Sequence, residues 1–238
     1  MSQHQQTVVI TGANRGIGFA LVDQFLQGGW QVKATQRSDS GSRALAELTS
    51  RFPETLQIGQ MDITRQDEIT AFKNQIGSTL PIDLLINNAG VFPEHTATPF
   101  ETMKATEFEA AFRVNFHGTL AVTKALLPQL RRAPEARIVM MSSGAASIGA
   151  RSGRRYAYGA SKAALNHLTR GLAEELLPER ITVVAVSPGW VRTEMGGKEA
   201  DLSPEEAAEA LFKTFISLKP DATGQFLDRF GNTETYLW

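Results

Sequence analysis

The chain reads Thr11-Gly12-Ala13-Asn14-Arg15-Gly16-Ile17-Gly18 directly after the apolar run Val8-Val9-Ile10, and residues 19–26 then read as a helix. A glycine-rich turn between a strand and a helix is typical of a dinucleotide site, because glycines let the backbone approach a pyrophosphate at the positive end of the helix. The spacing is G-x-x-x-G-x-G, and no Gly-Lys-Ser/Thr closes the turn, so a P-loop is excluded. A lone glycine turn is more often an ordinary loop, but this context favours a dinucleotide.

A second feature is the pair Tyr158 and Lys162, which lie four residues apart in the run 156–165. Residues at this spacing share one face of a helix. An ammonium beside a phenol favours the phenolate and lowers the phenol pKa from about 10, toward the value wanted in a general acid. Such pairs also occur by chance on solvated helices, so the glycine turn gives this one its weight.

Composition limits the possible functions. With 238 residues, 42% of them hydrophobic, the chain can bury one substantial core, and we expect a single domain over 1–238. A formal charge of −1 gives no electrostatic reason to expect nucleic acid or an anionic membrane as partner. The lack of cysteine excludes thiol nucleophiles, and the four histidines lack ligand spacing, so no metal site is expected. With no signal-like or membrane-length apolar stretch, the expected address is the cytoplasm.

Short apolar runs alternate with longer amphipathic ones along the whole chain. This pattern predicts an α/β fold, with a mainly parallel seven-stranded sheet and helices on both faces. We predict strands at residues 7–11, 31–35, 56–61, 82–87, 137–141, 181–187 and 225–227. We predict helices at residues 16–27, 42–51, 66–76, 106–132, 155–177 and 204–216.

Taken together, the motifs resemble the short-chain dehydrogenase/reductase family in its compact single-domain branch. The resemblance covers nearly the whole chain, in order, through the glycine turn 12–18, Asp62-Ile63, Asn87-Asn88-Ala89-Gly90, Asn115, Ser142-Ser143, Tyr158 with Lys162, and Pro188-Gly189-Trp190-Val191-Arg192-Thr193. Each motif is common, whereas the ordered set is specific. The resemblance implies a Rossmann-type doubly wound sheet and an NAD(P)-dependent oxidoreductase that interconverts a carbonyl and an alcohol.

The resemblance also implies catalytic roles. Tyr158 would be the acid/base, Lys162 would lower its pKa and bind the nicotinamide ribose, Ser143 would hold the substrate oxygen, and Asn115 would hold a relay water. Ser143 precedes Tyr158 by fifteen residues, more than is usual in the family, which a two-residue insertion within 149–155 would explain. Ser142, on the opposite side of the strand, and Ser147 are the weaker alternatives.

The nucleotide side points to NADP rather than NAD. After the second predicted strand, Thr35-Gln36-Arg37-Ser38 has no carboxylate at the position that would bond a ribose 2′-hydroxyl, whereas Arg37 there and Arg15 in the glycine turn offer planar donors for a 2′-phosphate. The alternative is two solvated arginines. For Asp62, helix capping competes with an adenine contact. The full set of expected cofactor-binding residues is Gly12, Asn14, Arg15, Gly16, Ile17, Gly18, Arg37, Asp62, Ile63, Asn88, Ala89, Gly90, Tyr158, Lys162, Pro188, Gly189, Val191 and Thr193.

On the substrate side we expect a modest aldehyde or ketone, held by loops at the carboxyl ends of the strands. Phe92, Tyr156, Trp190 and Met195 suggest a partly apolar pocket, and Gly196-Gly197 suggests a movable lid. Relatives commonly form dimers or tetramers through the helices predicted at 106–132 and 155–177, so a homo-oligomer is expected. Two other functions remain open: a catalytically quiet NADP-binding signalling protein, and a cofactor-dependent epimerase or dehydratase.

Overall fold

The computed structural model describes residues 5–37, 43–94, 98–150, 153 and 155–238. Seven strands form one parallel sheet in the order β3-β2-β1-β4-β5-β6-β7. They are β1 (Thr7–Ile10), β2 (Gln31–Gln36), β3 (Leu56–Gln60), β4 (Leu84–Asn87), β5 (Ala136–Met141), β6 (Ile181–Val186) and β7 (Phe226–Leu227). All seven predicted strands are present, and the predicted α/β fold is confirmed.

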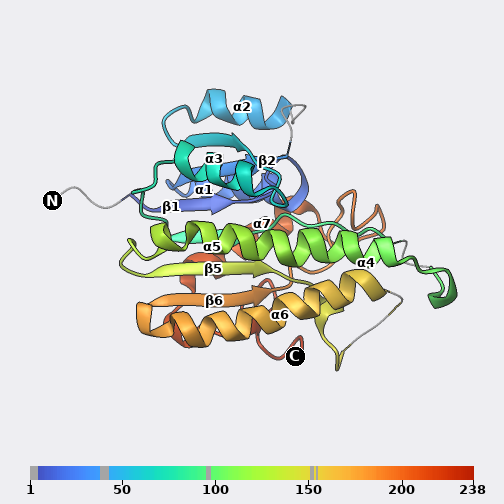
Figure 1. Ribbon diagram of the computed structural model, residues 1–238. Coiled ribbons are helices and arrows are strands. Elements are labelled where there is room, and N and C mark those ends of the chain that lie inside the picture. Colours follow the sequence, from blue (N-terminus) through green and yellow to red (C-terminus); the bar gives the residue numbers. More distant parts are fainter. Residues whose placement is uncertain (1–4, 38–42, 95–97, 151–152, 154) are drawn as a thin grey trace.

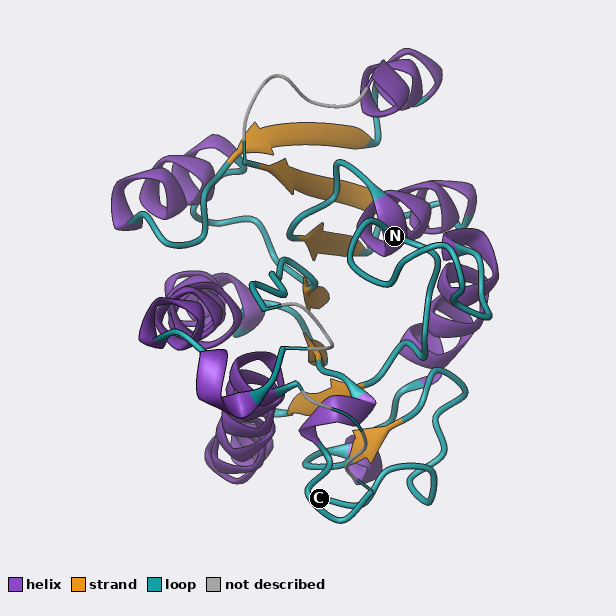
Figure 2. Ribbon diagram, turned by 90° about the vertical axis from the view of Figure 1, so that its right-hand side faces the viewer, coloured by secondary structure: helices purple, strands orange, loops and turns teal. Residues whose placement is uncertain are grey.

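Helices cover both faces of the sheet (Figures 1 and 2). On one face pack α1 (Gly16–Gln27), α2 (Arg43–Arg51) and α7 (Pro204–Ser217). On the other pack α3 (Gln66–Gln75), α5 (Thr119–Leu130) and α6 (Tyr156–Leu176), with α4 (Ala105–Phe112) leading into α5 and lying against α6. Short 3₁₀ turns lie at η1 (Phe100–Thr102), η3 (Gly144–Ala146), η4 (Leu177–Glu179) and η5 (Pro220–Ala222).

Each face buries its own apolar cluster. Phe25, Leu211 and Phe215 belong to the cluster beneath α1 and α7, whereas Phe72 and Leu165 belong to the cluster beneath α3, α5 and α6. The strands between them are apolar on both sides, as a sheet covered on both faces requires. The two clusters hold the sheet, and with it the strand ends, in place.

The helix predicted at 106–132 is not one continuous α-helix. The chain runs through α4, a π-helical segment η2 (Arg113–Gly118) and α5. The expectation of a single α-helix was therefore wrong in this respect. A π-turn inside a helix often marks a functional position, and this one contains the buried Asn115.

The strand order reverses between β1 and β4, since the chain adds β2 and β3 on one side of β1 before it crosses to β4 on the other. In sheets of this kind, ligands bind outside the carboxyl ends of the strands at the reversal point. The loops after β1, β4, β5 and β6 therefore define where the site lies.

Candidate active site

The glycine turn after β1 forms a tight cradle. Gly12 and Gly16 have positive φ angles of 64° and 55°. A Cβ on Gly18 would lie 2.2 Å from the Gly12 oxygen, and one on Gly12 would lie 2.9 Å from Cα of Ala89. In the same turn, Asn14 is half-buried and Ile17 packs against the core. The glycines therefore let the turn fold tightly against itself and against the loop after β4, and the turn leads directly into the N-terminus of α1, where N–H groups can bind a pyrophosphate.

The loop after β4 is tied to this turn. Asn88 Nδ2 donates hydrogen bonds to the main-chain oxygens of Thr11 and Gly12 at 2.9 and 3.0 Å, and the Thr11 hydroxyl accepts from the main-chain N–H groups of Asn88 and Ala89. Asn88 therefore ties the ends of the two neighbouring strands together. The two loops that flank the reversal point are fastened to each other by these bonds.

The strand β5 and the helix α6 bring Ser143 and Tyr158 together. Ser143 follows β5 and begins η3, where its hydroxyl accepts a hydrogen bond from the Ala145 N–H at 3.1 Å. Its side chain also lies close enough to the phenol of Tyr158, the third residue of α6, to act on the phenol's pKa. The Phe92 ring packs against the Tyr158 ring at 5.0 Å between centroids. A hydroxymethyl group and a phenol therefore meet at the carboxyl edge of the sheet.

The other serines have different partners. The Ser142 hydroxyl donates to Asn166 Oδ1 at 2.7 Å inside the protein, on the other side of the chain from Ser143. The Ser147 hydroxyl is fully buried and accepts from the Ala150 N–H. The fifteen-residue spacing from Ser143 to Tyr158 is thus compatible with contact, although part of the expected insertion, residues 151–152 and 154, lies outside the described residues.

Burial dominates the electrostatics of Tyr158 and Lys162. Burial raises the pKa of the Tyr158 phenol, while the Ser143 hydrogen bond and the Arg155 charge act to lower it. Burial also lowers the pKa of Lys162 to about 8. The Lys162 Nζ lies 5.8 Å from the centre of the Tyr158 ring. The expected lowering of the Tyr158 pKa by Lys162 stays a prediction.

Asn115 lies fully buried in the π-helical segment. Its amide group pairs with both main-chain polar groups of Val91: it accepts from the N–H at 2.8 Å and donates to the oxygen at 2.9 Å. It also donates to the Ser161 hydroxyl at 3.0 Å. A Cβ on Gly90 would lie 3.1 Å from Asn115 Oδ1 and 3.5 Å from Lys162 Nζ. Asn115 thus joins the β4 loop to α6 next to Lys162, while its expected relay water stays a prediction.

The expected adenosine end carries several charges. Arg15 forms an ion pair with Glu194, so its guanidinium reaches across from the glycine turn to the loop after β6. Arg37 is exposed at the end of β2. Burial alone would raise the pKa of Asp62, but hydrogen bonds from Thr64 and the charges of Arg37 and Arg113 hold it below its usual value.

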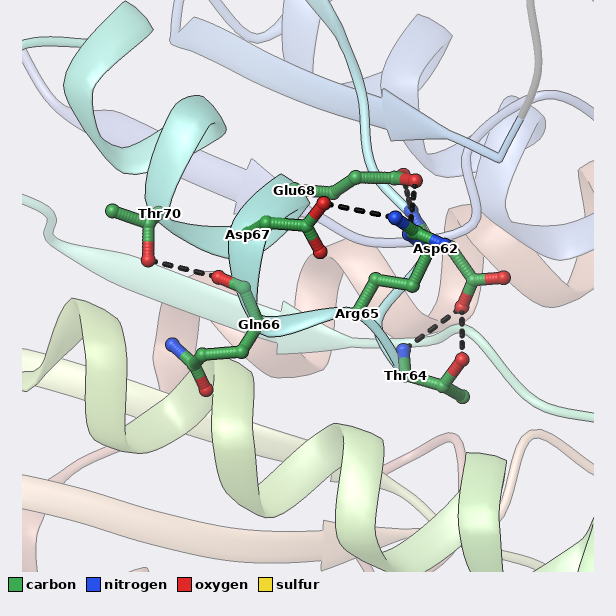
Figure 3. A network of polar contacts seen from close by, with 7 residues as sticks. All are labelled: Asp62, Thr64, Arg65, Gln66, Asp67, Glu68 and Thr70. Carbon is green, nitrogen blue, oxygen red and sulfur yellow. Dashed lines mark hydrogen bonds and ion pairs between the residues drawn. The ribbon is translucent and has the colours of Figure 1, made fainter.

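The Asp62 loop is internally bonded (Figure 3). Asp62 Oδ1 accepts from both the N–H and the hydroxyl of Thr64, and Glu68 Oε2 accepts from the Asp62 N–H at 2.7 Å. The following helix α3 begins at Gln66 with Arg65 at its N-cap. Asp62 therefore closes a turn at Thr64 and does not cap α3, which removes the simplest alternative to an adenine contact.

The side chain of Ile63 packs into the core. Ile63 is only 5% exposed and belongs to the cluster under α3, α5 and α6. A Cβ on Gly118 would lie 2.7 Å from Ile63 Cγ1, so the side chain packs against the π-helical segment. Its expected contact with the cofactor stays a prediction.

The loop after β6 is held by several of its own residues. Pro188 leads into Gly189, which has a φ of 87° and packs against Arg229 and Leu202. Val191 is buried and bridges to Leu202. Thr193 Oγ1 accepts from the Gly196 N–H at 3.0 Å, and a Cβ on Gly16 would lie 3.0 Å from Thr193 Cγ2. Thr193 therefore faces the glycine turn across the reversal point.

Aromatic and apolar residues line the substrate side. Trp190 is 49% exposed although its indole N–H donates to the Gly196 oxygen at 2.8 Å, and Met195 is 43% exposed. Tyr156 packs against Phe100 with 5.7 Å between ring centroids. The indole bond and the bridge from Val191 to Leu202 fasten the loop that carries the suggested lid, whose movement stays a hypothesis.

Two contributors were not identified from the sequence. Tyr236, near the C-terminus, stacks on Phe226 and contacts Gly144 beside Ser143. Glu94 Oε1 accepts a hydrogen bond from the Tyr158 N–H at 2.8 Å. Both contacts join segments far apart in the chain, and neither residue lies in a motif, so no local sequence signal could have found them.

Within the described residues, none of the helices combines the length and the apolar character needed to cross a membrane. The same part of the chain contains no group of three or more His, Cys, Asp or Glu residues able to hold a metal ion. The polar residues gathered at the strand ends are a phenol, hydroxyls, amides and an amine. This set is suited to binding and proton transfer.

Comparison with known proteins gives a family match. The model for the short chain dehydrogenase family matches residues 6–203. A protein named C-signal from Myxococcus xanthus is 37% identical over 154 residues, which cover 64% of this chain and 92% of that protein.

Two solved structures are similar over nearly their full lengths. The carbonyl reductase Sniffer of D. melanogaster superposes with a TM-score of 0.92 at 29% identity, covering 99% of this chain and 100% of the other. An NADPH-bound carbonyl reductase from chicken fatty liver superposes with a TM-score of 0.90 at 32% identity, covering 98% of this chain and 99% of the other.

Proposed function

The chain belongs to the short-chain dehydrogenase/reductase family of NAD(P)-dependent oxidoreductases, and from that premise we propose that it is an NADPH-dependent carbonyl reductase acting on a modest aldehyde or ketone. A single domain would carry both the cofactor cradle and the catalytic groups. The observation that carries the proposal is the placement of the Ser143 side chain close enough to the Tyr158 phenol to act on its pKa. It brings two proton donors to the place where a carbonyl oxygen would become an alkoxide.

Ser143, Tyr158 and Lys162 would have different roles in the reduction. The bound nicotinamide supplies the hydride. Ser143 would donate a hydrogen bond to the carbonyl oxygen and stabilise negative charge as it develops there. Tyr158 would transfer its phenolic proton to that oxygen, so that an alcohol leaves and a phenolate remains. Because a phenolate next to a buried ammonium is electrostatically favoured, Lys162 would stabilise this product state.

The residues also fit the cofactor. The cradle formed by Gly12, Gly16 and Gly18 is a tight turn, with no room for a Cβ on Gly12 or Gly18, and it leads into the N-terminus of α1, where main-chain N–H groups would bind a pyrophosphate. Arg37 and Arg15 would hold the 2′-phosphate, since guanidinium groups bind phosphate oxygens in a planar fork. The likeness to an NADPH-bound carbonyl reductase supports NADP over NAD. Equal kcat/KM values with NADPH and NADH would contradict a preference for NADP.

The test is a panel of aldehydes and ketones with NADPH, followed by absorbance at 340 nm. Oxidation of NADPH that depends on the carbonyl compound, and that disappears in Tyr158→Phe, supports the proposal. NADPH binding without turnover on any carbonyl compound would point to the second function, a catalytically quiet binding protein. The likeness to a protein named C-signal is the observation that favours this alternative.

Two further expectations extend the proposal. A cytoplasmic address would be tested by cell fractionation. A homo-oligomer paired through α4, α5 and α6 would be tested by analytical ultracentrifugation. Leu126 and Leu165 on these helices face the core, whereas Phe108, Phe112 and Leu120 remain half-buried. These three side chains, like Leu168 and Leu172 on α6, have surface left to bury in a partner.

A further inference from the structure

The turn that begins at Ser143 packs on a small apolar cluster of its own. Ala146, in η3, is 2% exposed and packs with Ala185 of β6 and Phe226 of β7, and the half-buried Tyr236 packs against these three. This cluster is separate from the two large clusters that hold the sheet. Part of the support of η3 therefore comes from β7 and from the segment after it, which ends close to β7 (Figure 2).

Tyr236 also lies directly on the main chain next to Ser143. A Cβ on Gly144 would lie 2.7 Å from Tyr236 Cε1, and the three heavy atoms nearest to that Cβ all belong to the Tyr236 ring. The same ring stacks on Phe226, with 5.3 Å between centroids and 24° between planes. Any side chain at position 144 would therefore displace either the ring or the turn.

The segment after β7 is folded back by Asp228, which is only 6% exposed. Its Oδ1 accepts hydrogen bonds from the main-chain N–H groups of Phe230 and Asn232, at 2.8 and 2.9 Å. Its Oδ2 accepts from the Asn232 amide at 3.0 Å and from the Thr235 hydroxyl at 2.8 Å. These four bonds hold the chain in a turn that returns Tyr236 to β7.

The turn η3 also contacts the helix that carries Tyr158. A Cβ on Gly159 would lie 3.0 Å from the Ala145 oxygen, so α6 lies close against the turn. The Ser143 hydroxyl accepts from the Ala145 N–H at 3.1 Å. This bond uses an acceptor site of the hydroxyl and leaves its proton for another acceptor. The direction of that proton and its distance from Tyr158 therefore depend on where η3 is held.

We propose that Tyr236 is a positioning residue of the active site: its ring holds η3 in place and thereby fixes the Ser143 hydroxyl where the substrate oxygen binds. The inference rests on the proposed function, in which Ser143 holds that oxygen. Tyr236 acts through Ser143 and takes no part in proton transfer. The effect of removing the ring should therefore appear in kcat and vanish when Ser143 is absent.

The first measurement needs no substrate. It is amide hydrogen exchange in wild type and Tyr236→Ala, resolved by NMR. In η3 the Ala146 N–H donates to the Ser143 oxygen at 2.8 Å, and the Ser147 N–H donates to the Gly144 oxygen at 3.1 Å. We expect these two N–H groups to exchange about two- to tenfold faster in Tyr236→Ala, the factor that corresponds to the loss of one aromatic pair.

Trp238→Ala is the matched control for this measurement. Trp238 also packs on Phe226, with 5.6 Å between ring centroids, and the Arg170 guanidinium lies over it. The atoms nearest to a Cβ on Gly144 belong to Tyr236 and not to Trp238. Trp238→Ala therefore removes an aromatic contact from the same support, and its two η3 amides should exchange at the wild-type rate.

The second measurement is the kcat of Tyr236→Ala, Ser143→Ala and the double variant, with NADPH and a carbonyl compound that the panel identifies. A misplacement of about 1 Å can lower a rate about 10²-fold. We therefore expect Tyr236→Ala to lower kcat about ten- to a hundredfold with little change in KM. In the Ser143→Ala background the same substitution should lower kcat by less than about twofold. Tyr236→Phe keeps the ring and should retain most of the wild-type kcat.

Unchanged exchange of the two η3 amides in Tyr236→Ala would overturn the proposal, and so would an equal acceleration in Trp238→Ala. An equal loss of kcat from Tyr236→Ala with and without Ser143 would also overturn it, because Tyr236 would then act elsewhere. A wild type that reduces no carbonyl compound would refute the proposed function, while the exchange rates still decide whether Tyr236 holds η3. If Tyr236→Ala does not fold, Tyr236→Leu, which lacks the flat ring, replaces it in both measurements.

Discussion

The Lys162 Nζ donates a hydrogen bond to the main-chain oxygen of Met141 at 2.7 Å. Met141 is the last residue of β5, directly before Ser142 and Ser143, so this bond fixes α6 against the strand that delivers Ser143. The ammonium is only 4% exposed, and burial lowers its pKa to about 8. Burying the Lys162 ammonium therefore opposes folding, but it places a positive charge where it would stabilise a Tyr158 phenolate.

Lys162→Met should make the protein more stable at pH 7. Below pH 8 the lysine is charged in both the folded and the unfolded chain, and the folded chain carries the full cost of burying it. Between pH 8 and about 10.4 the folded chain loses the proton first, so wild-type stability rises with pH. The pKa of Lys162 is lowered from 10.5 to about 8. Removing this cost, less the hydrogen bond that the variant loses, should raise the free energy of unfolding of Lys162→Met by about 2 kcal/mol at pH 7.

Urea unfolding at several pH values measures this difference. The advantage of Lys162→Met over wild type should shrink as the pH rises from 8 to 10, while turnover is lost at every pH. Lys124→Met on the exposed side of α5 is the control and should show no such trend. A Lys162→Met protein less stable than wild type at pH 7 would mean that the ammonium is not buried at a cost.

Arg37→Ala should weaken NADPH binding and spare NADH. Hydrogen bonds to charged groups contribute about 1.5–3 kcal/mol, so we expect a loss of about ten- to a hundredfold in the NADPH affinity. Fluorescence titration of both cofactors against wild type and Arg37→Ala measures it. An unchanged NADPH constant would mean that Arg37 is only a solvated side chain.

Glu194→Gln should tighten NADPH binding slightly. Arg15 is paired with Glu194 in this structure, so a 2′-phosphate that uses Arg15 must first displace the carboxylate. Exposed ion pairs are worth about 0.2–1 kcal/mol, which corresponds to a gain of at most about fivefold. Fluorescence titration with NADPH measures this gain in affinity. A loss of affinity in this variant would show that Arg15 is not the phosphate ligand.

Gly18→Ala should impair both folding and cofactor binding, because its Cβ would lie 2.2 Å from the Gly12 oxygen and 2.5 Å from Asn88 Nδ2. Gly171→Ala in α6 is the matched control, since nothing lies within 4 Å of that Cβ. Alanine in a helix interior is favoured by about 0.5–1 kcal/mol, so the control should gain stability. Thermal unfolding with and without NADPH distinguishes the two, and equal behaviour would contradict the cradle.

The sequence predicted the fold well because the relevant signals are local. One short stretch predicts a strand, a turn and a helix through Val8-Val9-Ile10, Gly12 and Gly18. The helix α1 has the predicted bounds. The interruption at Arg113–Gly118 was not predictable in this way. This π-helical segment contains Asn115, whose side chain is hydrogen-bonded to the main chain of Val91. Hydrophobic periodicity does not predict such a tertiary contact.

The candidate site was predicted in part for the same reason. Spacing singled out Tyr158 and Lys162, the family resemblance added Ser143, and the structure brings the three together at the carboxyl edge of the sheet. The pKa direction of Tyr158 could not be inferred, because it depends on how deeply the phenol is buried and on Glu94. Both are consequences of packing between segments far apart in the chain.

The central claim is that Tyr158 delivers the proton when a carbonyl compound is reduced. The most direct measurement compares NADPH oxidation by wild type and Tyr158→Phe on the same carbonyl compound, with NADPH affinity and thermal unfolding measured for both proteins. We predict that kcat/KM falls by about 10²–10⁴-fold while affinity and stability change little. A Tyr158→Phe protein that reduces the compound at the wild-type rate would contradict the claim.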